Sequence, residues 1–257
     1  MIYTVLVGGY DQLIQHKYVD PTYDYICFSN DFEEGSKGIW RVKHFPACDI
    51  KNNHLLSRLP KLQPHLFLSD YDFSIYVDAN IDIRDDFIIK QAEEKYREGI
   101  KYAGVKHQLR NCLYRESLEV TLKGFEKKFS DVIKQMKSYR NDGFPFNYGM
   151  FEANVIYRAH NDERIKQQSD DWWNEVKFHS KRDQLSLSYT LWKNKIPFAF
   201  LLPEDEWSRN SVHLECYRHI QQGSFMNKCW VYLKENLLLP IIGPVLYPFY
   251  KKIFLRA

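Results

Sequence analysis

The sequence has few cysteines, and their spacing gives no sign of a shared site. The five cysteines are an odd number and form no Cys-x-x-Cys pair, which disfavours a disulfide framework and a structural zinc site. The sequence also has no Asn-x-Ser/Thr sequon and opens without a basic, cleavable leader. No apolar run reaches the ~20 residues that span a bilayer. These absences lead us to expect a cytoplasmic protein.

Two nucleotide-binding signatures are missing as well. There is no G-x-x-x-x-G-K-[ST] motif and no G-x-G-x-x-G after the first predicted strand. A kinase, a P-loop NTPase and a dinucleotide oxidoreductase are therefore disfavoured. The net charge is only +3, and a dedicated nucleic-acid binder usually carries a much larger basic excess. We expect no nucleic-acid partner.

The positive charge gathers at the C-terminal end of the chain. Residues 225–257 carry five basic side chains and one acid, for a net charge of +4, which leaves −1 on the preceding residues. Residues 237–250 are almost wholly apolar, with three prolines among them and lysines on both sides. The segment can lie on an anionic membrane face, or it can dock on the domain core. We therefore divide the chain into a domain of residues 1–222 and an amphipathic tail of residues 223–257.

Strand-like and helix-like segments alternate along the domain. Apolar, β-branched runs predict strands at residues 2–7, 24–29, 40–44, 74–77, 102–105, 150–157 and 198–202. Amphipathic or capped segments predict helices at residues 52–59, 88–98, 118–139, 170–178 and 184–193. This alternation predicts an α/β fold, with a mostly parallel central sheet flanked by helices in a single domain.

The strongest local motif is Asp78-Ala79-Asn80, which directly follows a predicted strand. In open α/β sheets, ligands bind beyond the carboxyl ends of the strands. A carboxylate and an amide oxygen two residues apart are suitable ligands for Mg²⁺ or Mn²⁺. A turn rich in Asp and Asn is the alternative interpretation.

The context of this motif resembles a known family. The chain has a basic helix, then Leu-Pro, then YDFSIYVDAN. This order resembles the one in glycosyltransferases of the GT-A fold, such as the glycogenin-like and bacterial galactosyltransferase-like families. The closer resemblance is to a glycosyltransferase-like family of plant mucilage- and turgor-related proteins and bacterial surface-polysaccharide proteins. Four further segments carry it, over about residues 3–193: YTVLVGGYD, KHQLRNCLYRE, FEANVIYRAHN and WWNEVKFHSKRDQLSLSYTLWK.

The resemblance implies a binding site for a nucleotide-sugar donor. It places a divalent metal, Mn²⁺ or Mg²⁺, on Asp78 and Asn80, with His213 as a third ligand from later in the chain. Asn80 stands where the family motif has a second Asp, so lower metal affinity and metal-independence are both open. The remaining donor-binding candidates are Gly8, Gly9, Tyr10, Asp11, Arg58, Lys61, His107, Arg110 and Asn154.

The resemblance also proposes catalytic carboxylates. Asp183, in the SKRDQLSL segment, matches the Asp-Gln part of an acceptor site and would accept the acceptor's proton if the reaction inverts configuration. Glu152 is the second candidate. Asp183 also precedes a predicted helix, so a helix cap is an equally open role.

Together these features predict a glycosyltransferase that moves a sugar from a nucleotide-diphosphate donor, with uridine diphosphate the expected nucleotide. The expected acceptor is a glycan or a lipid-linked glycan in surface polysaccharide synthesis, handled at the cytoplasmic face of a membrane. Two alternatives remain: a metal-dependent hydrolase that uses the same carboxylates on a glycan or lipid, and a non-catalytic sugar-binding protein.

Overall fold

An eight-stranded sheet forms the centre of the molecule. The computed structural model describes residues 1–46, 49–126, 128–219, 233 and 239–255. The strand order is β3-β4-β2-β1-β5-β8-β7-β9, and a second sheet of two strands pairs β10 with β6. In the large sheet β3 and β8 run antiparallel to the other six strands. The predicted α/β class with a mostly parallel sheet in a single domain is confirmed.

The described helices and strands follow the predicted alternation. The strands are β1 (Ile2–Val5), β2 (Tyr25–Phe28), β3 (Gly35–Lys37), β4 (Trp40–Lys43), β5 (Ser74–Val77), β6 (Ile81–Ile83), β7 (Tyr102–Lys106), β8 (Phe151–Arg158), β9 (Ala199–Phe200) and β10 (Leu214–Cys216). The helices are α1 (Asn53–Leu62), the short 3₁₀ helix η1 (Pro64–Leu66), α2 (Phe87–Arg97), α3 (Leu113–Lys123), α4 (Phe129–Asn141), α5 (Glu163–Phe178), α6 (Gln184–Lys193) and α8 (Leu239–Leu255).

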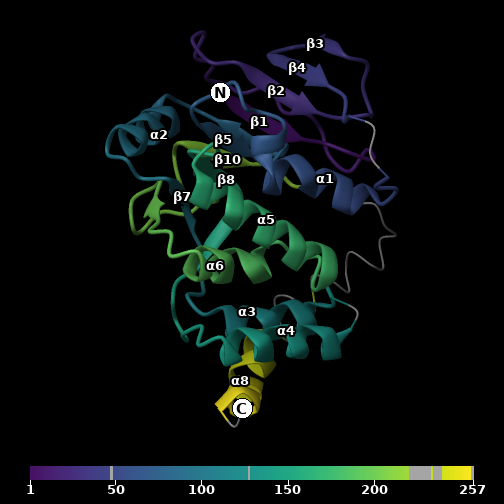
Figure 1. Cartoon of the computed structure of the whole chain (residues 1–257), viewed down its shortest axis with the longest axis vertical. Helices are drawn as coiled ribbons and strands as arrows, with labels where there is room; N and C mark the ends of the chain where they lie inside the picture. The colour runs from purple at the N-terminus through teal and green to yellow at the C-terminus, as the bar shows by residue number, and fades with distance from the viewer. Residues whose placement is uncertain (47–48, 127, 220–232, 234–238, 256–257) are drawn as a thin grey trace.

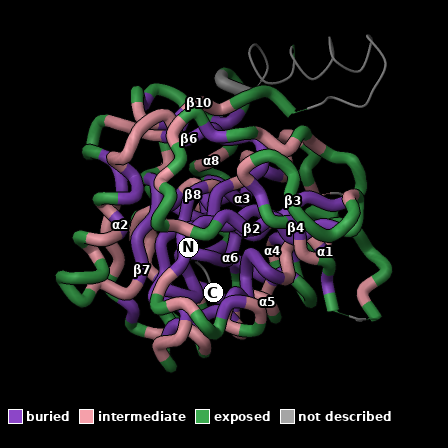
Figure 2. The backbone as a smooth tube through the Cα atoms, turned by 90° about the horizontal axis from the view of Figure 1, so that it is seen from above, coloured by how far each residue is buried: buried purple, intermediate pink, exposed green. Residues whose placement is uncertain are grey.

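Helices cover both faces of the sheet because its strands are apolar on both sides. In β1, Tyr3 packs with residues of α1, α5 and α6, whereas its neighbour Ile2 packs with residues of α2 on the other face. Figure 1 shows α1, α5 and α6 on the near side of the sheet. Seen from above, buried residues occupy the middle of the molecule and exposed loops surround it (Figure 2).

A third apolar cluster lies beyond the sheet and joins α3, α4, α6 and α8. Tyr114 of α3, Tyr139 of α4 and Phe254 of α8 are all buried within it. The C-terminal helix is therefore part of the folded body, and it forms the lower end of the molecule in Figure 1. Among the described residues, no helix is both long enough and apolar enough to cross a membrane.

Several element boundaries differ from the prediction. The single helix predicted at residues 118–139 is wrong: α3 ends at Gly124, whose left-handed φ of 75° favours glycine, and α4 is a separate helix. The first helix, predicted to end at Leu59, continues through Pro60. The tail helix likewise contains Pro244 and Pro248.

Candidate functional site

Several predicted site segments lie at one edge of the sheet. β1, β5 and β7 run in the same direction, so the residues after them, Gly8–Asp11, Asp78 and His107–Arg110, lie at their shared carboxyl edge. The antiparallel strand β8 begins at this edge, and it brings Glu152 and Asn154 there. Ligands bind at this edge in open α/β sheets.

Asp78 is the first residue after β5, and two side chains contact its carboxylate. The Tyr76 hydroxyl donates a hydrogen bond to Asp78 Oδ1 over 2.5 Å, and Lys61 Nζ lies 3.4 Å from the same oxygen. The Asp78 N–H donates to the Asn154 carbonyl, which extends the pairing of β5 with β8. Sequence reasoning missed Tyr76, although residues two apart in a strand share a face.

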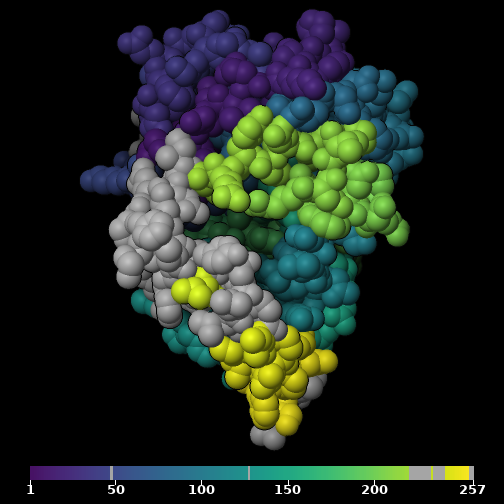
Figure 3. All heavy atoms as spheres, turned by 180° about the vertical axis from the view of Figure 1, so that it is seen from behind, coloured from purple at the N-terminus to yellow at the C-terminus, as the bar shows by residue number. Residues whose placement is uncertain are grey.

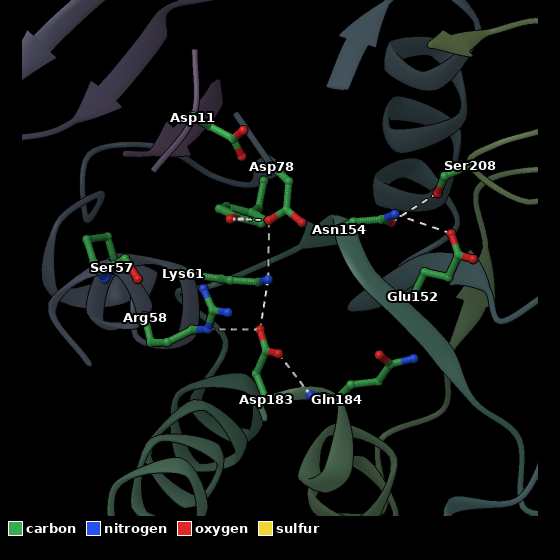
Figure 4. A network of polar contacts seen from close by, with 12 residues as sticks. Asp11, Ser57, Arg58, Lys61, Asp78, Glu152, Asn154, Asp183, Gln184 and Ser208 are labelled. Carbon is green, nitrogen blue, oxygen red and sulfur yellow. Dashed lines mark hydrogen bonds and ion pairs between the residues drawn. The ribbon is translucent and has the colours of Figure 1, made fainter. Parts of the chain in front are cut away.

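Lys61 joins the carboxylates of Asp78 and Asp183. Its side chain is only 3% exposed, and its Nζ lies 2.8 Å from Asp183 Oδ2. Arg58, one turn earlier on α1, places its Nε 3.4 Å from the same oxygen. Two cations and two carboxylates thus form a compact, neutral cluster at the sheet edge (Figure 4). We call Arg58, Lys61, Asp78 and Asp183 the charged cluster.

The charged cluster changes the acidity of Asp183. Burial alone would raise the pKa of this carboxyl, but Arg58 and Lys61 together hold it well below its usual value. Asp183 Oδ1 also accepts a hydrogen bond from the Gln184 N–H, which makes it the N-cap of α6. The predicted cap contact is therefore confirmed. A carboxylate with so low a pKa is a weak proton acceptor at neutral pH.

Long-range hydrogen bonds hold α1 and α6 in place. Asn52 caps α1 by accepting from the N–H groups of the first turn, as the sequence predicts. At the other end of α1, the Tyr3 hydroxyl donates to the Pro60 carbonyl, and the buried Arg158 guanidinium donates to the Lys61 carbonyl. For α6, the Trp172 indole N–H donates to the Asp183 carbonyl. The backbone that carries Lys61 and Asp183 is therefore held in place by these hydrogen bonds.

Glu152, Asn154 and Ser208 form a polar row beside the charged cluster. Asn154 Nδ2 donates to Glu152 Oε2 over 3.2 Å, and the Ser208 hydroxyl donates to Asn154 Oδ1 over 3.1 Å. Within the described residues no lysine or arginine forms an ion pair with Glu152. Figure 4 shows the row on the far side of Asp78 from Arg58. Sequence reasoning missed Ser208, which enters from the loop after β9.

The loop after β1 is shaped by a carboxylate. The N–H groups of Gly8 and Gly9 each donate to one oxygen of Asp31 over 2.9 Å, and both glycines have left-handed φ values. At Gly8 the φ of 77° favours glycine, and a Cβ there would also displace the Asn53 side chain of α1. These two amides already have a carboxylate partner.

The next two residues of this loop contact His219. Asp11 Oδ2 lies 2.5 Å from His219 Nδ1, and the exposed Tyr10 ring lies against the same imidazole. Figure 4 shows Asp11 above Asp78. The loop therefore places the Tyr10 ring near the carboxyl edge of the sheet.

The predicted metal ligands are not gathered into one set. Asn80 is buried, and its amide donates to the Tyr217 carbonyl over 2.7 Å. His213 pairs with Asp85 through Nδ1 at 2.8 Å and stacks on Phe87. Within the described residues, no three His, Cys, Asp or Glu side chains lie close enough together to hold a metal. A metal at Asp78 stays a prediction.

His107 and Arg110 belong to a separate cluster. His107 Nδ1 accepts from the N–H groups of Leu109 and Arg110, and Arg110 forms a short ion pair with the buried Glu116. Burial, together with the nearby positive charge of Arg110, lowers the pKa of His107 to about 4. No described contact joins these two side chains to the charged cluster, and they shape the turn between β7 and α3.

A comparison with known protein families assigns the chain to one of them. The model of the TOD1/MUCI70, glycosyltransferase-like domain family matches residues 20–219. The chain belongs to this family. The match includes every residue of the charged cluster and of the polar row, and so supports a glycosyltransferase-type function.

Two parts of the molecule lie outside the matched range. They are β1 with its Gly8–Asp11 loop, and α8. No curated protein is significantly similar to the chain.

Proposed function

We propose that this protein is a nucleotide-sugar-dependent glycosyltransferase, with a uridine diphosphate sugar as donor. The observation that carries the proposal is the charged cluster, a buried lysine and an arginine at the carboxyl edge of the sheet of a glycosyltransferase-like family member. Cations aimed at a departing diphosphate stabilise the charge that develops there. The proposed acceptor is a glycan or a lipid-linked glycan.

Arg58 and Lys61 are suited to bind the donor diphosphate. Arg58 contacts Asp183 through Nε, and in the described part of the chain its two Nη groups form no ion pair. A guanidinium can offer those groups to a phosphate as paired donors. Lys61 is held between two carboxylates, so its ammonium stays at a fixed position while the leaving group gains charge. Asp183 positions both cations.

Glu152 is our candidate for the residue that takes the proton from the acceptor hydroxyl if the reaction inverts configuration. Among the described residues no lysine or arginine forms an ion pair with it, and Asn154 Nδ2 donates to its carboxylate. Asn154 and Ser208 would hold hydroxyl groups of the donor sugar. Asp183, the first candidate from sequence, has both oxygens engaged. The two assignments make different predictions, which are compared in the Discussion.

The proposed function is tested by nucleotide binding. Thermal unfolding and calorimetry with UDP, GDP and a panel of nucleotide sugars should show stabilisation by UDP and by one UDP-sugar. Arg58→Ala should weaken UDP binding about 10- to 100-fold, because a hydrogen bond to a charged group contributes about 1.5–3 kcal/mol. Arg84→Ala is the matched control, since Arg84 is similarly exposed and pairs with Glu215 away from the cluster.

The alternatives predict other results. A hydrolase has no need to bind the nucleotide, and a sugar-binding protein would be stabilised by free sugars rather than by UDP. Absence of nucleotide binding and of diphosphate release from every donor would overturn the proposal. Repeating the titrations with EDTA and with added Mn²⁺ tests the predicted metal: UDP affinity that is unchanged by both would show that the cations suffice.

A further inference from the structure

The C-terminal helix α8 has two unlike faces. Its docked face consists of Gly243, Tyr247, Tyr250 and Phe254, at spacings of four, three and four residues, which is one face of a helix. Tyr250 and Phe254 are buried, and the Tyr250 hydroxyl lies 2.8 Å from Ser117 Oγ of α3. A Cβ on Gly243 would come within 2.8 Å of Glu119 Oε1, so this face fits closely against α3.

The outward face of α8 is apolar and exposed. Val245 is 62% exposed and Phe249 64% exposed. The face also includes Ile241, Ile242, Leu246 and Ile253. Seen from behind, the helix forms the tapered end of the molecule (Figure 3). An exposed apolar patch of this kind marks an interaction surface.

The charged side chains of α8 itself have one sign. Residues 239–255 contain no Asp or Glu, and Lys251 and Lys252 lie two and three residues after Phe249. Lys252 Nζ lies 5.6 Å from the centre of the Phe249 ring, so an ammonium stands at the edge of the apolar face. On α3 the exposed Arg115 lies over Tyr247, beside the same helix. Hydrocarbon bordered by cations matches an anionic lipid surface.

We propose that α8 docks the protein on an anionic membrane surface, with its outward face inserted at the level of the headgroups. Among the described residues, α8 packs on the core through one side and leaves its other, apolar side exposed. Two copies meeting through this face would bring their lysines together with no acid on α8 to pair with them. A bilayer accepts the lysines, since their ammonium groups can reach the phosphates.

The experiment is flotation of the full chain with phosphatidylcholine vesicles that contain or lack phosphatidylglycerol. We expect binding to the anionic vesicles only, and release at high salt because exposed charges are then screened. Val245→Asp with Phe249→Asp should abolish binding. Lys252→Gln should weaken it about fivefold, the value for loss of one charge near such a surface. None of these measurements requires a donor sugar, so they are independent of the proposed enzymatic function.

Phe178→Asp is the matched control. Phe178 is 68% exposed, like Phe249, but lies at the end of α5. It should bind vesicles like the native chain, and thermal unfolding should show that all variants are folded. Native protein that stays unbound on anionic vesicles at low salt would overturn the proposal. So would a native dimer that becomes monomeric in the Val245–Phe249 variant, because the face would then bind a second copy.

Discussion

The charged cluster and the outward face of α8 depart from the usual burial pattern in opposite ways. At the sheet edge the chain buries lysine and aspartate, whereas on α8 it exposes valine, isoleucine and phenylalanine. Charged residues are rarely buried unless they are paired, and large exposed apolar patches are rare on soluble proteins. Both regions therefore point to function.

The two regions should respond differently to mutation. Each member of the charged cluster is the counter-ion of another, so removing one leaves an uncompensated charge out of water. Side chains of the outward face are exposed, so their replacement removes little packing within the described part of the chain. Stability should therefore be sensitive to substitution in the charged cluster and tolerant of substitution on the outward face of α8.

Lys61→Met should have the largest effect. Methionine keeps most of the length of the side chain but removes the cation between Asp78 and Asp183, and breaking a buried pair costs about 3–5 kcal/mol of unfolding free energy. Binding of UDP should be lost as well. Denaturant unfolding measures the first effect and calorimetry the second.

Lys90→Met is the control for Lys61→Met. Lys90 is 68% exposed and pairs with Asp86 one turn away on the surface, so its removal should change stability little. Equal losses of stability in the two variants would contradict the view that burial makes the cluster sensitive.

The next prediction separates the two carboxylates in the proposed chemistry. Glu152→Gln should lower kcat by about 10²- to 10⁴-fold, the usual loss when a general base is removed, and leave the Kd for UDP unchanged. Asp183→Asn should mainly weaken UDP binding, because asparagine can still cap α6 but no longer holds Arg58 and Lys61. If Asp183→Asn instead lowered kcat and Glu152→Gln weakened UDP binding, Asp183 would be the general base. A product of retained configuration would mean that neither residue acts as a general base.

Much of the fold and part of the candidate site could be predicted from the sequence, because they depend on short segments of the chain. Apolar runs predict the strands, and polar residues directly after them, such as Asp78, must lie at the carboxyl edge of a parallel sheet. The Asn52 and Asp183 caps follow from residue type and position. Even Tyr76, which was missed, is two strand residues before Asp78 and could have been found.

The pairings within the cluster could not be predicted in the same way. Lys61 and Asp183 lie on helices far apart in the chain, and they meet because Tyr3 and Arg158 fix one helix and Trp172 the other. No local pattern encodes such a contact. The same holds for α8: its composition indicates an apolar segment, but only packing against α3 decides which side remains exposed.

A smaller effect is expected from pH. The pKa of Asp183 in the folded protein lies below the value of about 3.9 for an unfolded aspartate. The unfolded chain therefore takes up a proton first as pH falls, so this carboxylate stabilises the fold above about pH 4 and its contribution is lost in acid. Unfolding free energy measured from pH 6 to pH 2 should fall less steeply in Asp183→Asn than in the native chain. Parallel curves would mean that the ion pairs of Asp183 contribute little.

The smallest effect should come from the outward face of α8. Val245→Thr keeps the branched shape of the side chain and adds a hydroxyl that water can reach, so we expect a stability change within about 0.5 kcal/mol, as for other surface substitutions. On the docked face, Phe254→Ala removes a fully buried ring and should cost about 3–5 kcal/mol. Helix propensity cannot explain a loss of stability in Phe254→Ala, because alanine favours a helix more than phenylalanine does. A large loss of stability in Val245→Thr would mean that another part of the protein covers this face in solution, and it would remove the contrast on which membrane docking rests.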